Sequence, residues 1–186
     1  MTAGIFVRHG VWVGRVRAPS HHNAKGFFES NSIVQVMKKE FPDVPGAGLA
    51  WPVPGVRAQI ESAVMSDGYA GGPWMYKCTA LYTPAFYEFE YDAVCVLRDP
   101  QAIFNSTRAS HMFGADMSDN ELRDNITLHQ EHMYNLIDDG AAAVYPEALI
   151  DGDFSSLEAA FLHCGLEYQQ KIATDFVDAK LWHFRS

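Results

Sequence analysis

Apolar residues at helical spacing, together with helix-start residues, predict six helices along the chain. Ile33, Met37 and Phe41, for example, recur on one helical face, and Ser30 or Asn31 precedes them as an expected cap. In chain order, the expected helices are 1–10, about 31–41, 56–68, one from residue 100, one from 119 to about 139 and one from 155.

Three further start signals are local. Asp99 and Pro100 are expected as the cap and first residue of the fourth helix. A serine followed three residues later by a glutamate predicts a capping box. Two such boxes are expected, formed by Ser118 with Glu121 and by Ser155 with Glu158.

Four short segments predict strands, at 11–13, 74–78, 93–97 and 141–145. The run at 93–97 is continuously apolar, as is typical of a strand buried on both faces, and 141–145 is expected to be the next buried strand. Strands that alternate with helices favour a parallel sheet covered on both sides. We therefore expect an α/β fold, a three-layer α/β/α arrangement with a mostly parallel sheet, in a single domain spanning 1–186.

Composition indicates a soluble protein and restricts its partners. The 186 residues are 48% hydrophobic and 20% charged, without an apolar run long enough for a membrane span or a secretory signal. Cys78, Cys95 and Cys164 are expected to be reduced core residues of a cytoplasmic protein. The net charge of −9 argues against nucleic acid as a partner. Six basic residues against one acidic residue up to Lys39 suit a small anionic ligand, or else a solvated basic helix face.

Polar residues at strand ends are the first candidates for chemistry, because ligands of α/β sheets bind there. Arg98 follows the buried run 93–97, where its guanidinium can bind a phosphate. Ser106 lies two turns into the next helix and can point to the same anion. The alternative is that Arg98 pairs with Asp99 or another carboxylate.

Two more segments bring charge next to apolar residues. Lys25 and Glu29 flank a glycine and two phenylalanines, so that Glu29 can act as a general base or simply favour a helix dipole. Lys77 interrupts an apolar strand. It either faces inward towards an anion or lies on an edge strand facing solvent.

Other chemistries find little support. His9, His21 and His22 lack zinc-ligand spacing, and His129 with His132 has no completing ligand, so no metal is expected. The sequence contains neither a G-x-S-x-G elbow nor a Walker A motif.

Taken in order, several segments resemble the sulfotransferases, especially the small bacterial and phage-encoded ones. The segment 4–14 is similar to their first helix and the turn after it. The other matching segments are 23–30 (NAKGFFES, like NPKGYFED), 74–77 (WMYK, like WxWK), 96–100 (VLRDP, with Ser106 eight residues after the arginine) and 145–149 (YPEAL) with 164–166 (CGL). The family's opening strand and PRSGTS loop have no counterpart before Thr2, so the resemblance covers only part of the family's cofactor site.

The resemblance implies a P-loop-like fold that binds 3′-phosphoadenosine 5′-phosphosulfate as co-substrate. Arg98 and Ser106 would hold its 3′-phosphate, and Thr2, at the expected helix start, is a further cofactor-binding candidate. Glu29 would be the base for an acceptor hydroxyl or amine, and Lys77 would neutralise the transferring sulfuryl group.

The acceptor would be a small molecule or a carbohydrate. The segments 42–55 and 112–118 are expected to shape its pocket, with Trp51, Phe113 and Tyr69 as lining candidates. Two alternatives stay open: a non-catalytic binding or assembly protein that keeps the fold, and a kinase-like phosphoryl transferase.

Overall fold

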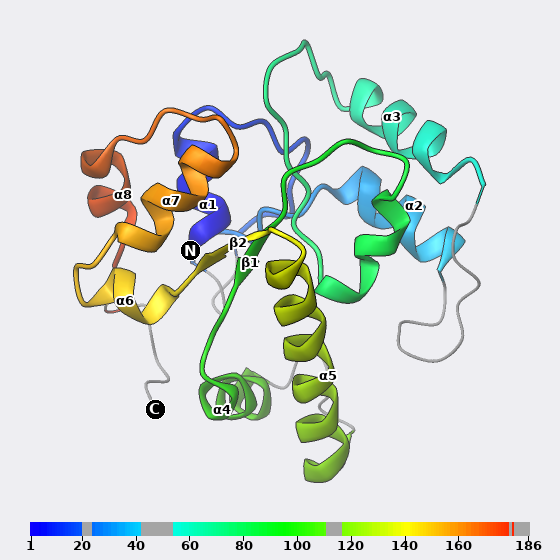
Figure 1. Ribbon diagram of the computed structural model, residues 1–186. Helices are drawn as coiled ribbons and strands as arrows, with labels where there is room; N and C mark the ends of the chain where they lie inside the picture. The colour runs from blue at the N-terminus through cyan, green and yellow to red at the C-terminus, as the bar shows by residue number, and fades with distance from the viewer. Residues whose placement is uncertain (20–23, 42–53, 111–116, 179, 181–186) are drawn as a thin grey trace. The chain divides into compact units, whose positions relative to one another are not determined.

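The computed structural model describes residues 1–19, 24–41, 54–110, 117–178 and 180, and the chain folds into two compact units. The N-terminal unit comprises residues 3–91. The C-terminal unit comprises residues 92–186 with residues 1–2 (Figure 1). The expected single domain of 1–186 stays a prediction.

The N-terminal unit is mainly helical. Its elements are α1 (Thr2–Arg8, of which Thr2 falls in the other unit), α2 (Asn31–Glu40), α3 (Val56–Ser66) and the 3-10 helix η1 (Ala80–Phe86). Helix α2 packs on α3, and α3 contacts η1. The buried residues between α2 and α3 are Ile33, Met37, Phe41, Val56, Ile60 and Val64. The spacing also selects Val34, which is only partly buried.

A buried carboxylate joins three parts of this unit. Asp67 follows α3, and its side chain is 4% exposed. It accepts hydrogen bonds from the Ser32 hydroxyl at 2.6 Å and the Arg15 backbone N–H at 3.1 Å. The hydroxyl of Ser30, which caps α2 by accepting from the Ile33 N–H, lies 3.4 Å from the same carboxylate. Burial of a charge is tolerated only when donors surround it, as they do here.

The C-terminal unit contains a two-stranded parallel sheet. Strand β1 (Val94–Val96) pairs with β2 (Ala142–Val144), and Cys95 is opposite Ala143. The described residues of this unit form five helices: α4 (Pro100–Ser110), α5 (Asp119–Asp138), α6 (Pro146–Ile150), α7 (Ser155–His163) and α8 (Gln170–Phe176). Helix α5 contacts β1, α7 packs on β2, and α4 packs on α5.

The helix starts follow most of the expected signals. Asp99 accepts a hydrogen bond from the Ala102 N–H at 2.7 Å, and Ser118 forms the expected capping box with Glu121. The second capping box is wrong. Helix α7 already includes Ser155, and the neighbouring Asp153 carboxylate accepts from the Ser155 N–H at 2.9 Å, so serine is not the cap.

The strand predictions are confirmed in part. Mixed α/β character holds, but residues 74–78 are not a regular strand: Trp74 forms only an isolated parallel bridge with Trp12. Strand β1 is not buried on both faces, because Val96 is 36% exposed. Cys78 is also exposed rather than in the core. The three-layer arrangement stays a prediction, since the sheet of the described residues has two strands.

A substitution at Gly14 tests how tightly the chain packs around the Asp67 carboxylate. Its φ is +75°, and a Cβ there would lie 2.8 Å from an Asp67 carboxylate oxygen. Gly10 has a similar φ of +89° but nothing within 4 Å of that position. We expect Gly10→Ala to cost about 1 kcal/mol, from the left-handed backbone alone. Gly14→Ala should cost about 3 kcal/mol, because strain and a steric clash combine. Urea unfolding followed by tryptophan fluorescence measures both, and equal losses would contradict the tight packing at Asp67.

Candidate functional site

Arg98 lies where the parallel strands end. Because Val96 is opposite Val144, the residues two or three positions beyond each strand meet at the same edge of the sheet. Arg98 therefore comes close to Glu147 of α6. From α5, the Gln130 side-chain amide donates to the Arg98 carbonyl at 2.9 Å, which ties this loop to the helix. The structure thus places Arg98 as the sequence predicts, between a strand and the start of α4.

Two carboxylates, those of Glu147 and Asp99, interact electrostatically with the Arg98 guanidinium. Burial lowers the pKa of Arg98, and the charges of Glu147 and Asp99 act in the opposite direction. One carboxylate oxygen of Glu147, Oε1, is buried and accepts no hydrogen bond within the described chain. The electrostatics therefore agree with the alternative in which Arg98 interacts with nearby carboxylates. A phosphate bound to Arg98 would compete with them.

Ser106 and Thr2, the other two residues expected to bind the cofactor, each offer one hydroxyl group. Ser106 is the seventh residue of α4 and is partly buried. Thr2 is 5% exposed, and its Oγ1 has no hydrogen-bond partner among the described residues. Thr2 is the first residue of a helix of only seven residues, whose dipole is weak. A ligand at this position would therefore interact with the Thr2 hydroxyl rather than with the helix dipole.

The N-terminal unit brings Glu29 and Lys77 together. Lys77 Nζ lies 2.6 Å from a Glu29 carboxylate oxygen and also donates to the Phe27 carbonyl at 3.1 Å. Both side chains are partly exposed, at 43% for Lys77 and 38% for Glu29. Lys77 therefore faces solvent rather than the core. Glu29 pairs with Lys77, a contact between distant segments that sequence analysis did not predict.

The side chains of residues 74–77 point alternately to opposite sides, which explains why Lys77 faces solvent. Trp74 and Tyr76 pack against the core between α2 and α3. In an extended segment the next side chain points to the opposite side, which is where Lys77 meets Glu29. The opposite charges of Lys77 and Glu29 were the one sequence signal that could have suggested the pair.

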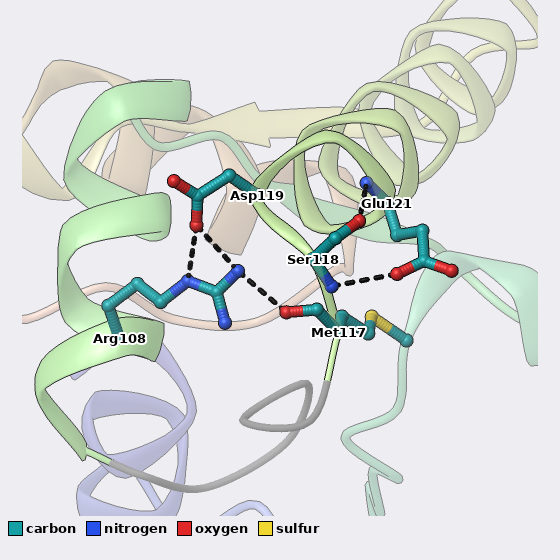
Figure 2. Close-up of polar contacts among 5 residues, drawn as sticks. All are labelled: Arg108, Met117, Ser118, Asp119 and Glu121. Carbon is teal, nitrogen blue, oxygen red and sulfur yellow. Dashed lines mark hydrogen bonds and ion pairs between the residues drawn. The ribbon is translucent and has the colours of Figure 1, made fainter.

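Arg108 of α4, in the C-terminal unit, has a structural role. Its Nε and Nη2 atoms donate to the same Asp119 oxygen at 3.1 and 2.8 Å, and Nη2 also donates to the Met117 carbonyl at 2.8 Å. Figure 2 shows these contacts beside the capping box of Ser118 and Glu121. Arg108 thus joins the end of α4 to the start of α5.

Several predictions lie outside the described residues, namely those on His21, His22, Trp51, Phe113 and most of 42–55 and 112–118. Within the described ranges, no three or more histidine, cysteine or acidic side chains gather as a metal site would need. His129 Nδ1 lies 2.8 Å from the Asn125 carbonyl of its own helix. Every described helix is too short or too polar to cross a bilayer.

Comparison with known proteins gives no relative. No family model matches the sequence, and neither the curated proteins nor the solved structures include a match. The function must therefore be argued from Arg98, Glu29 and Lys77 and from the motifs that contain them.

The Glu29–Lys77 pair lends itself to a double-mutant cycle. Because both side chains are partly exposed, solvent screens their attraction, and the coupling energy should be under about 1 kcal/mol. The coupling energy follows from the free energies of unfolding in urea of the unmodified protein, Glu29→Gln, Lys77→Gln and the double variant. A coupling above about 2 kcal/mol would mean that the pair is a main structural contact, and effects of either variant on activity would then need correction for stability.

Proposed function

We propose that this protein is a sulfotransferase. It would move a sulfuryl group from 3′-phosphoadenosine 5′-phosphosulfate to a hydroxyl or amine of a small-molecule or carbohydrate acceptor. The proposal is supported by the ordered motifs of the sequence and, above all, by the position of Arg98. This arginine follows β1, at the carboxyl edge of a parallel strand pair, directly before a helix of eleven residues.

That position suits recognition of the 3′-phosphate. The guanidinium offers several N–H donors in a planar fork that matches phosphate oxygens. Ser106 would add a hydroxyl from α4. The Asp99 carboxylate already accepts from a backbone N–H at the start of α4, so side chains rather than that helix terminus would supply the donors.

The Glu29–Lys77 pair supplies groups of the kind that the transfer needs. The acceptor O–H or N–H would lose its proton to Glu29 while a bond forms between the acceptor atom and sulfur. The bond from sulfur to the bridging phosphate oxygen would break, and adenosine 3′,5′-bisphosphate would leave. Lys77 would offset negative charge on the sulfuryl oxygens. Such transfers depend on in-line geometry and fixed positive groups.

Calorimetric titration with adenosine 3′,5′-bisphosphate tests the role of Arg98. We expect micromolar binding that adenosine 5′-monophosphate does not reproduce, because the 3′-phosphate is the group recognised. Arg98→Ala should weaken binding at least tenfold, about 1.5 kcal/mol for a charge-assisted contact. Arg123→Ala, which removes an exposed arginine from α5 of the same unit, is the control and should leave the affinity unchanged.

Equal affinity for the two nucleotides, or unchanged affinity in Arg98→Ala, would overturn the assignment of the 3′-phosphate site. Arg98 would then interact with carboxylates such as those of Glu147 and Asp99 rather than with a phosphate. Binding of the bisphosphate without turnover of the sulfated nucleotide on any acceptor would favour a non-catalytic binding protein.

Glu29→Gln tests the catalytic step separately. Removing the carboxylate should lower turnover at least a hundredfold, the usual scale for a general base, while nucleotide affinity stays within twofold. Release of adenosine 3′,5′-bisphosphate from the sulfated nucleotide, measured over a panel of phenols, amines and sugars, gives the rate. Full activity of the variant would remove Glu29 as the base.

A further inference from the structure

A cavity in the N-terminal unit lies between one face of α3 and the chain that follows it. Its volume is about 440 Å³. Arg57 and Glu61 of α3 lie along it, one helical turn apart. Its other walls are apolar and mostly aromatic: Val64, Met65, Tyr69, Trp74 and Phe89.

Neighbouring contacts hold the aromatic walls in place. The Trp74 and Phe89 rings are 6.2 Å apart at 73°, close to perpendicular. Backbone hydrogen bonds between Trp12 and residues 73 and 75 fix the segment that carries Trp74. The Tyr69 hydroxyl donates to the Gly72 carbonyl, and the centroids of the Tyr69 and Trp12 rings lie 5.2 Å apart in an edge-to-face arrangement. A ligand would therefore find rings that are already ordered, at little entropic cost.

The charges around the cavity favour a cation. Arg57 donates to the Glu61 carboxylate at 2.8 Å and to the Glu88 carbonyl at 2.6 Å, and it lies 5.2 Å over the Phe89 ring. Its guanidinium is thus already engaged on three sides. Besides Glu61, the carboxylates of Glu88 and Glu90 act electrostatically on Arg57, although neither of these two residues lines the cavity.

The Arg57–Phe89 contact also shows which chemistry these rings support. A cation over an aromatic face is attracted by the ring quadrupole. Trp74 gives the strongest attraction of this kind, and no lysine or arginine of the described chain lies over the rings of Trp74 or Tyr69. Apolar walls would not replace the water shell of a metal ion, but they suit a cation that carries its own apolar groups.

We propose that this cavity binds an organic cation of the quaternary or alkylated ammonium class, with the alkyl groups against Trp74 and Tyr69 and the charge near Glu61. The site is separate from the Glu29–Lys77 pair, because Trp74 and Lys77 point to opposite sides of their segment. The proposal does not depend on sulfuryl transfer.

Three probes of nearly the same shape test the proposal by calorimetry and tryptophan fluorescence on the full chain. Choline carries the positive charge, 3,3-dimethyl-1-butanol is its neutral isostere, and 3,3-dimethylbutanoate carries a negative charge. At constant ionic strength, choline should bind at least fivefold more tightly than the neutral alcohol, and the anion should bind most weakly.

Two variants locate the site. Glu61→Gln keeps the size of the side chain and should weaken choline binding at least threefold without changing binding of the alcohol. Trp74→Leu should reduce the preference for choline over the alcohol to less than twofold. Glu131→Gln, an exposed helical glutamate of the other unit, is the control and should have no effect. Near-ultraviolet circular dichroism checks folding, and Glu61→Gln carries the test if Trp74→Leu does not fold.

Each contrary outcome overturns the proposal. Equal binding of choline and the alcohol would indicate an unselective apolar cavity. Tighter binding of the butanoate, strengthened further in Glu61→Gln, would indicate an anion site at Arg57. Absence of binding by all three probes would mean that the cavity takes no ligand of this size.

Discussion

The buried carboxylate of Asp67 holds three separate segments of the N-terminal unit together. A charge that is 4% exposed needs several donors, and these come from Arg15, Ser30 and Ser32. Ser30 also starts α2, and Glu29 precedes it directly. Asp67 therefore connects the end of α3 to the start of α2 and to the segment that carries Glu29. The close approach of Gly14 to Asp67 belongs to the same constraint.

The C-terminal unit uses a different device to position its charged residues. Parallel pairing in register brings the ends of β1 and β2 to one edge, and Arg98 and Glu147 follow from that register. The same geometry that would make Arg98 available to a phosphate also brings a carboxylate, Glu147, that would compete with the phosphate. The affinity of this edge for an anion would therefore depend on how far attraction by Arg98 exceeds repulsion by the Glu147 and Asp99 carboxylates.

Local signals in the sequence predicted local structure well. The Ser30 cap, the Asp99 cap and the capping box of Ser118 each require only a few neighbouring residues, and each is present. The expected capping box of Ser155 with Glu158 is absent. The Ser155 N–H, which would have donated to the Glu158 side chain, donates instead to the Asp153 carboxylate. Contacts between distant segments were out of reach. Nothing in either segment alone shows that Lys77 meets Glu29, since that pairing follows from how Trp74 and Tyr76 pack on the helices.

The excess of basic residues near the N-terminus does not by itself produce a strong positive electrostatic potential, because several of these residues have partners close by. Arg15 lies 3.9 Å from the Asp67 carboxylate, and Lys39 lies 2.9 Å from Glu40. Arg17 lies over the Phe27 ring at 4.9 Å. Each of these three cations thus lies beside a carboxylate or over an aromatic ring. Because a field decays within about 10 Å in salt, dispersed and paired charges attract a ligand weakly. Attraction of an anion would therefore depend on individual groups such as Arg98 and Lys77, and attraction of a cation on the carboxylates near Arg57.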